Sequence, residues 1–74
     1  MQATPLSPRQ AEILNLVVQG HGNKTIARQL FLSEKTVKNQ LTVVFRKLNV
    51  QSRTQAAVWA VQQNVPVSEW AARY

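Results

Sequence analysis

The side chains best suited to binding chemistry lie between positions 33 and 48, in the stretch SEKTVKNQLTVVFRKL. This stretch contains four cations and one acid, Glu34, with polar and apolar residues between them. Helical spacing places three hydrogen-bonding side chains on one strip, Lys38, Asn39 and Thr42. A lysine suits the acceptors of guanine and an asparagine suits adenine, so this strip is predicted to contact base edges in a major groove.

The first turn of the same stretch contains side chains suited to a phosphate backbone. A helix N-terminus favours an anion, and hydroxyl, amide and ammonium groups gather there. We therefore expect phosphate contacts from Ser33, Lys35, Thr36 and Gln40, and from Lys24 at an earlier helix start. The alternative is that these cations form only a solvated face and that Lys24 is an ordinary solvated lysine.

The sequence contains no pattern typical of catalysis or of metal binding. It has no cysteine, which removes disulfides and thiolate metal sites. His21 stands alone in a glycine-flanked segment, and we expect an exposed loop residue there. Glu12 and Glu34 are expected to pair locally, Glu34 with Lys38 at i+4. We therefore predict no enzyme, no metal site and no cofactor.

The overall charge favours a polyanionic partner. Nine Lys and Arg residues against three Asp and Glu residues give a formal net charge of +6 and a pI near 11.0. Such a small basic domain suits nucleic acid or an anionic membrane surface. A membrane-surface helix needs a broadly apolar face that is free to leave the core. The apolar stripes of the predicted helices are instead expected to pack against one another, which disfavours a membrane-surface helix. No run of residues approaches the ~18 of a membrane span, and no signal peptide pattern begins the chain, so we expect a cytoplasmic protein.

Start and stop signals predict four helices and an all-α fold. The segment 7–10 has the pattern of a capping box with proline at the first helical position, and 52–55 has a second capping-box pattern. Asn23 and Ser33 are predicted N-caps, and Pro66 ends the last helix. The predicted helices form a compact four-helix bundle and lie at about 8–19, 24–31, 34–48 and 53–63.

Apolar spacing orients these helices. The third helix is expected to turn a stripe inward that consists of Val37, Leu41, Val44, Phe45 and Leu48. The inner side of the fourth is expected at Ala56, Ala57, Ala60 and Val61. A short second helix, a tight turn and a longer basic third helix are the arrangement of a helix-turn-helix. Ala27 is small enough for the two helices to cross closely, and Leu32 can fill the gap between them.

The chain divides into three parts by composition. We expect a linker or frayed end at 1–5, one domain at 6–65, and a tail at 66–74 with a further helical turn around Trp70. The linker-like start favours an excised output domain over a small regulator that stands alone.

The sequence resembles the C-terminal DNA-binding domain of the LuxR/GerE/NarL family of bacterial transcription regulators. The resemblance rests on LSPRQAEIL at 6–14, GHGNKTIARQLFLSEKTVKNQL at 20–41 and RKLNVQSRTQAAVWA at 46–60. It implies a response regulator or LuxR-like regulator that binds an inverted-repeat site in double-stranded DNA as a dimer. It also implies a bacterial, cytoplasmic and nucleoid-associated location, with RNA polymerase as a further candidate partner.

The resemblance also implies roles for individual residues. Base contacts would come from Lys38, Asn39 and Thr42. Phosphate contacts would come from Lys24, Thr25, Ser33, Lys35, Thr36, Gln40 and Arg46. The fourth helix would form a dimer interface through Gln55, Val58, Trp59 and Gln62, although Trp59 could instead belong to the core.

Two positions depart from the family pattern. The family usually has an acid where Gln10 stands and often has a histidine where Gln40 stands. Gln10 can close the capping box but cannot neutralise a cation such as Lys47 or Arg53. The domain would therefore be less stable, or those cations would be more available to bind phosphate. The alternative function is an interaction or dimerisation module that has this fold and does not itself bind DNA.

Overall fold

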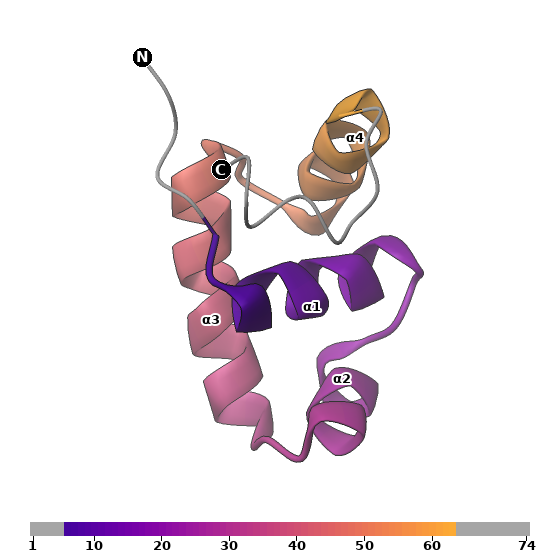
Figure 1. The fold of residues 1–74 in the computed structure, drawn as a ribbon, viewed down its shortest axis with the longest axis vertical. Coiled ribbons are helices and arrows are strands. Elements are labelled where there is room, and N and C mark those ends of the chain that lie inside the picture. The colour runs from indigo at the N-terminus through magenta and orange to yellow at the C-terminus, as the bar shows by residue number, and fades with distance from the viewer. Residues whose placement is uncertain (1–5, 64–74) are drawn as a thin grey trace.

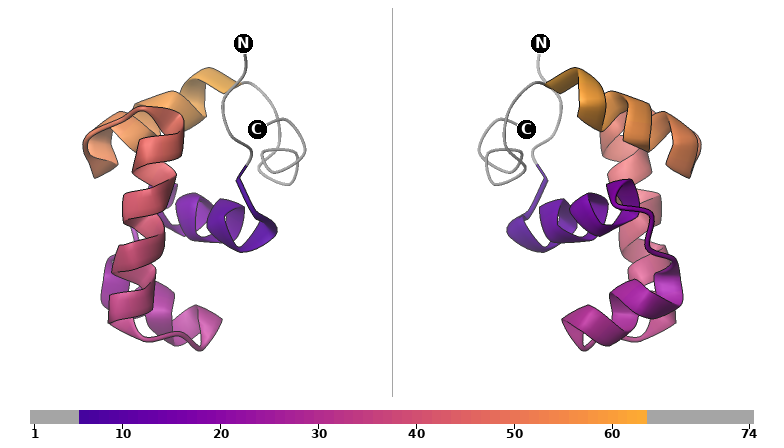
Figure 2. Two further views of the ribbon diagram at one scale, coloured as in Figure 1. Left: turned by 90° about the vertical axis from the view of Figure 1, so that its left-hand side faces the viewer. Right: turned by 90° about the vertical axis from the view of Figure 1, so that its right-hand side faces the viewer.

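The computed structural model describes residues 6–63, which form four helices and no strand. They are α1 (Pro8–Val18), α2 (Asn23–Leu30), α3 (Glu34–Leu48) and α4 (Arg53–Gln63). Helix α3 is the long axis, α1 crosses it near its middle, and α2 and α4 lie toward its opposite ends (Figures 1 and 2). The predicted all-α fold with a helix-turn-helix is confirmed. The predicted linker at 1–5 and tail at 66–74 lie outside the described residues.

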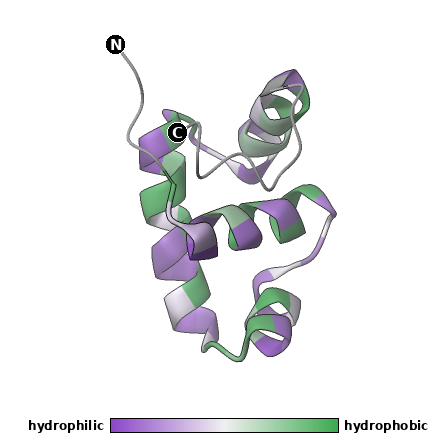
Figure 3. Ribbon diagram, in the orientation of Figure 1, coloured by the Kyte–Doolittle hydropathy of each residue, from purple (hydrophilic) through white to green (hydrophobic). Residues whose placement is uncertain are grey.

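The apolar residues form two clusters that share α1 and α3. The first joins α1, α3 and α4 through Leu6, Ala11, Leu14, Val44, Leu48 and Ala56. The second joins α1, α2 and α3 through Ile13, Val17, Ile26, Ala27, Val37 and Leu41. Phe45 packs against both clusters, which confirms the predicted inward stripe of α3. Figure 3 shows how polar and apolar residues alternate along that helix.

The turn between α2 and α3 is stabilised by Ala27 and Leu32, the two residues predicted to pack there. Ala27 is buried in the second cluster, and Leu32 is half-buried against the same cluster. The backbone N–H of Leu32 donates to the carbonyl oxygen of Ala27 at 2.8 Å, which closes the end of α2. The close crossing that a helix-turn-helix requires therefore comes from a small residue on α2 and an apolar one in the turn.

Three helices end in the same way, with one residue in the left-handed region followed by a backbone bond that spans five residues. These residues are Gly20 with φ 98°, Phe31 with φ 59° and Asn49 with φ 58°. The closing bonds run from His21 to Leu16, from Leu32 to Ala27 and from Val50 to Phe45. Glycine suits this position because it has no Cβ to approach the backbone, and asparagine tolerates it because its short polar side chain can hydrogen-bond locally. Phe31 is the exception, and its side chain is 94% exposed.

Three local predictions were wrong. Gly22, not Asn23, is the N-cap of α2, and Asn23 is the first helical residue. Val61 is 79% exposed and lies outside the inner side of α4. The second capping box is only half formed: the N–H of Gln55 donates to Ser52 Oγ at 3.2 Å, but Gln55 Oε1 accepts from the N–H of Gln51 at 2.7 Å.

Candidate nucleic-acid interface

The start of α3 is fixed by its own side chains. Ser33 Oγ accepts from the backbone N–H of Thr36 at 3.0 Å and donates to Thr36 Oγ1 at 2.9 Å. Ser33 is therefore the N-cap, as predicted, and its hydroxyl hydrogen is already in use. The hydroxyl of Thr36 accepts that bond and keeps its own hydrogen, so Thr36 is the better placed of the two to donate to a phosphate.

The outer side of α3 presents all three predicted base-contacting residues to solvent. Lys38, Asn39 and Thr42 are exposed, and so are Lys35 and Arg46 among the predicted phosphate contacts. The buried residues of α3 are Val37, Leu41, Val44 and Leu48, which leave this side of the helix outward. The structure thus leaves the three residues predicted to contact bases exposed on the same side of α3.

Thr42 is less versatile than its residue type suggests. Its hydroxyl Oγ1 donates to the backbone carbonyl of Lys38 at 3.1 Å, one helical turn earlier. Such a bond back to the preceding turn is common for threonine in helices. With its hydrogen used there, Thr42 presents outward only acceptor lone pairs and a methyl group. These suit an amino group of cytosine or adenine, or the methyl group of thymine.

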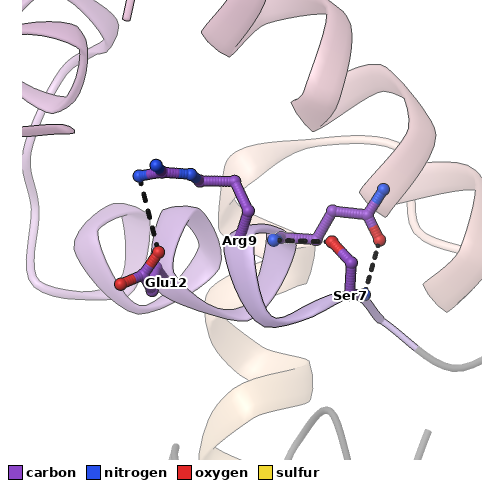
Figure 4. Close-up of polar contacts among 4 residues, drawn as sticks. Ser7, Arg9 and Glu12 are labelled. Carbon is purple, nitrogen blue, oxygen red and sulfur yellow. Dashed lines mark hydrogen bonds and ion pairs between the residues drawn. The ribbon is translucent and has the colours of Figure 1, made fainter. Parts of the chain in front are cut away.

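The exposed cations of α3, Lys35, Lys38 and Arg46, have no carboxylate partner among residues 6–63. Among residues 6–63 the one ion pair joins Arg9 and Glu12 of α1 at 3.5 Å (Figure 4). Glu12 therefore pairs locally, as expected, but the predicted pair between Glu34 and Lys38 does not form. Both of those side chains are exposed, where a lysine–glutamate pair gains little and loses side-chain freedom. The positive charges of Lys35, Lys38 and Arg46 are left available to an external anion.

The start of α2 is open because Asn23 is engaged elsewhere. Its Oδ1 accepts from Arg53 Nη2 of α4, and Arg53 Nη1 donates to the carbonyl of His21 at 3.4 Å. The N-cap, Gly22, has no side chain to cap the helix. Lys24 is exposed and Thr25 half-buried in this first turn, so both predicted phosphate contacts lie beside backbone N–H groups that no side chain caps.

Gln40 is the predicted phosphate contact whose surroundings differ most from expectation. It is half-buried, and its Oε1 accepts from Gln10 Nε2 at 3.1 Å. Gln10 is buried, and its Oε1 accepts from Lys47 Nζ at 2.9 Å and from the N–H of Ser7 at 2.9 Å. The two positions that depart from the family pattern are thus hydrogen-bonded to each other. Sequence reasoning missed this contact, and the joint departure was the available signal.

The outer side of α4 is apolar. Val58 is 52% exposed, Gln55 and Gln62 are exposed, and Ala57, Val58, Val61 and Gln62 line an open hollow. Trp59 is half-buried and packs against the first core cluster, as the core alternative proposed. Val61 was not predicted for this surface, because its spacing on α4 placed it with the inner alanines.

Within residues 6–63, no group of three or more His, Cys, Asp or Glu residues could hold a metal ion. None of the four described helices is long and apolar enough to cross a membrane. His21 lies in the α1–α2 loop, as expected, but it is half-buried and not exposed.

Known proteins resemble this chain over most of its length. A profile of the GerE family, described as bacterial regulatory proteins of the luxR family, matches residues 4–60. The nitrate/nitrite response regulator NarL of Escherichia coli K12 is 43% identical over 60 residues, which are 81% of this chain and 28% of NarL. The chain therefore spans little more than a quarter of that relative.

Two solved structures share the fold. The DNA-binding domain of the response regulator ComA, in complex with the anti-activator RapF, superposes with a TM-score of 0.74 at 45% identity. That match covers 76% of this chain and 97% of the ComA domain. The transcription factor GerE superposes with a TM-score of 0.70 at 38% identity, over 77% of this chain and 85% of GerE.

Proposed function

The chain belongs to the luxR family of bacterial regulatory proteins, and from this membership we propose that it binds specific double-stranded DNA as the output domain of a transcription regulator. Residues 6–65 form the binding unit. The whole protein is a response regulator or LuxR-like regulator that acts on the nucleoid in the bacterial cytoplasm, with RNA polymerase as a further partner.

One observation carries the proposal: the outer side of α3 combines exposed hydrogen-bonding groups with cations that have no carboxylate partner among residues 6–63. Helix α3 enters the major groove, where Lys38, Asn39 and Thr42 contact base edges. Backbone phosphates are held by Lys24, Thr25, Lys35, Thr36, Gln40 and Arg46, and by Ser33 when its hydroxyl hydrogen turns from Thr36 toward the phosphate. A face that is only solvated needs no mixture of hydrogen-bond donors and acceptors on one strip. DNA binding accounts for this mixture, because base edges present both donors and acceptors.

The experiment begins with selection of binding sites from a random duplex pool. The affinities of the wild type, Lys38→Ala and Lys35→Ala are then measured by fluorescence anisotropy on the selected duplex and on a scrambled duplex. Lys38→Ala should weaken binding to the selected duplex far more than to the scrambled one. Lys35→Ala should weaken both equally and lower the slope of log K against log salt by roughly 0.9. Equal effects of the two variants on both duplexes would show that α3 does not select bases.

The second element of the proposal is a homodimer through α4. The exposed valines and the open hollow form an apolar surface of the kind found at protein interfaces. Gln55, Val58, Trp59 and Gln62 were predicted for this interface, and Val61 joins them. Val61→Asp should abolish cooperative binding to the two half-sites, whereas Val61→Leu, which keeps the surface apolar, should preserve it. If Val61→Asp still binds the two half-sites cooperatively, the dimer contact does not involve this surface of α4.

The alternative is an interaction module that does not itself bind DNA. It is favoured by one observation, that the similar ComA domain was solved in complex with a protein, the anti-activator RapF. Salt separates the two functions, because DNA affinity falls steeply with ionic strength and apolar pairing does not. An interaction module would pair through α4 at high salt and would enrich no motif from the pool.

A further inference from the structure

We propose that Gln10, a buried residue of α1, is a positioning residue that fixes which end of the Gln40 amide faces DNA. The structure assigns to Gln40 an outward N–H donor and an inward oxygen. This inference rests on the proposed function, since it concerns how one residue of the binding surface meets the backbone of a duplex.

The orientation of the Gln10 amide is determined by its two donors. Gln10 is 7% exposed, and its Oε1 accepts from the backbone N–H of Ser7 and from the ammonium of Lys47, each at 2.9 Å. Neither a backbone N–H nor an ammonium group can accept a hydrogen bond. The reversed amide would place an NH₂ group against two donors, so Oε1 must occupy this end and Nε2 the other.

The orientation of Gln40 follows from that of Gln10. The Nε2 group of Gln10 can only donate, and it lies 3.1 Å from the side-chain oxygen of Gln40. Gln40 must therefore turn its oxygen inward and its own NH₂ group away. Within residues 6–63, no hydrogen bond uses Gln40 Nε2. Gln40 is half-buried and lies one turn along α3 from Thr36, and in the proposed arrangement its free N–H groups lie at the surface.

The resulting chain of hydrogen bonds runs in one direction, from the Lys47 ammonium through Gln10 to Gln40. Bonds aligned in this way polarise one another, so the positive charge strengthens the final donor. A phosphate oxygen can only accept, which makes an outward N–H complementary to the DNA backbone and an outward carbonyl repulsive. Gln10 thus sets the polarity of a surface residue on another helix without contacting DNA itself.

Gln10→Glu tests the assignment because it keeps the acceptor and removes the donor. The carboxylate can still accept from Ser7 and from Lys47, so the melting temperature should stay level or rise. Gln40 must then turn its NH₂ group toward the carboxylate and its oxygen toward DNA. Affinity for the selected duplex should fall about three- to tenfold, the size of one hydrogen bond.

The added negative charge is controlled with a double-mutant cycle. In a Gln40→Ala background the same charge enters, but no amide is present to reverse. Gln10→Glu should therefore weaken binding about three- to tenfold more in the wild type than in Gln40→Ala. The side-chain NH₂ resonances of Gln40 should also shift when duplex is added to the wild type.

Three results would overturn the inference. They are an equal effect of Gln10→Glu in the two backgrounds, a lowered melting temperature of Gln10→Glu, and full affinity of Gln40→Ala. Failure of the proposed function has a different signature, because the wild type would then bind no duplex in a salt-dependent manner.

Discussion

Replacing Phe31 with glycine is expected to stabilise the fold. Phe31 ends α2 in the left-handed region, with φ 59°, and its side chain is 94% exposed. The backbone there is held by the bond from the N–H of Leu32 to the carbonyl of Ala27. The position therefore imposes a conformation that a phenylalanine adopts at a cost, while the ring gains almost no burial in return.

The size of the effect follows from two opposing terms. A residue with a Cβ costs roughly 1–2 kcal/mol in this region compared with its ordinary conformations. A glycine loses more backbone freedom on folding, which offsets roughly 0.5–1 kcal/mol of that gain. The midpoints of the two ranges leave a net stabilisation of about 0.75 kcal/mol, which in a domain of this size corresponds to a rise of roughly 3–6 °C in melting temperature.

Thermal unfolding followed by far-ultraviolet circular dichroism measures the change in melting temperature. Urea titration should show a higher midpoint with an unchanged m-value, as expected for a change in stability alone. The other two left-handed helix ends supply the controls. Asn49→Gly should gain only a few tenths of a kcal/mol, because asparagine already tolerates this region. Gly20→Ala should lose about 1 kcal/mol through backbone strain alone, since a Cβ at Gly20 meets no atom within 4 Å.

The expected order of melting temperatures relative to the wild type is therefore a rise for Phe31→Gly, little change for Asn49→Gly and a fall for Gly20→Ala. A fall for Phe31→Gly would refute the reasoning, because it would mean that the exposed ring stabilises the fold by more than its backbone costs.

Three further changes test other parts of the fold. Ser33→Ala removes the cap of α3 and should lower the free energy of unfolding by about 1 kcal/mol in urea titrations; an unchanged midpoint would contradict the assigned cap. Arg53→Lys loses the two-pronged contact with the His21 carbonyl and Asn23, and should cost about 1–2 kcal/mol and speed amide exchange in the α1–α2 loop. Ile26→Val removes one methylene group from a fully buried position and should cost about 0.5–1.5 kcal/mol by calorimetry, without changing which DNA sequence is bound.

The sequence predicted best what depends on neighbours along the chain. The cap at Ser33 and the capping box from Ser7 to Gln10 involve residues three apart, and both form. The inward stripe of α3 follows from helical spacing alone. The exposure of Lys38 was predicted for the same reason, because the opposite side of a helix must face solvent once one side is buried.

Contacts between distant segments were beyond such reasoning. Asn23 has the side chain of a good N-cap, but its Oδ1 accepts a hydrogen bond from Arg53, thirty residues away in the sequence. Gln10 and Gln40 are also thirty residues apart, and only the crossing of α1 and α3 brings them together. Val61 has an inner position by spacing, yet α4 meets the core through Ala56, Trp59 and Ala60 and leaves Val61 79% exposed.

The division of the core into two clusters has a consequence for how such proteins diverge. Helices α2 and α4 do not pack against each other, apart from the hydrogen bond from Arg53 to Asn23, and each packs against α1 and α3 (Figure 2). Substitutions at distant sites without shared partners act independently on stability. In the proposed function, the dimer surface on α4 and the DNA surface on α3 can therefore change separately, so related proteins could acquire new pairing preferences and keep the same DNA site, or the reverse. Arg53 bonds α4 to α2, and Phe45 packs against both core clusters. Substitutions at these two positions are therefore expected to affect both parts of the domain at once.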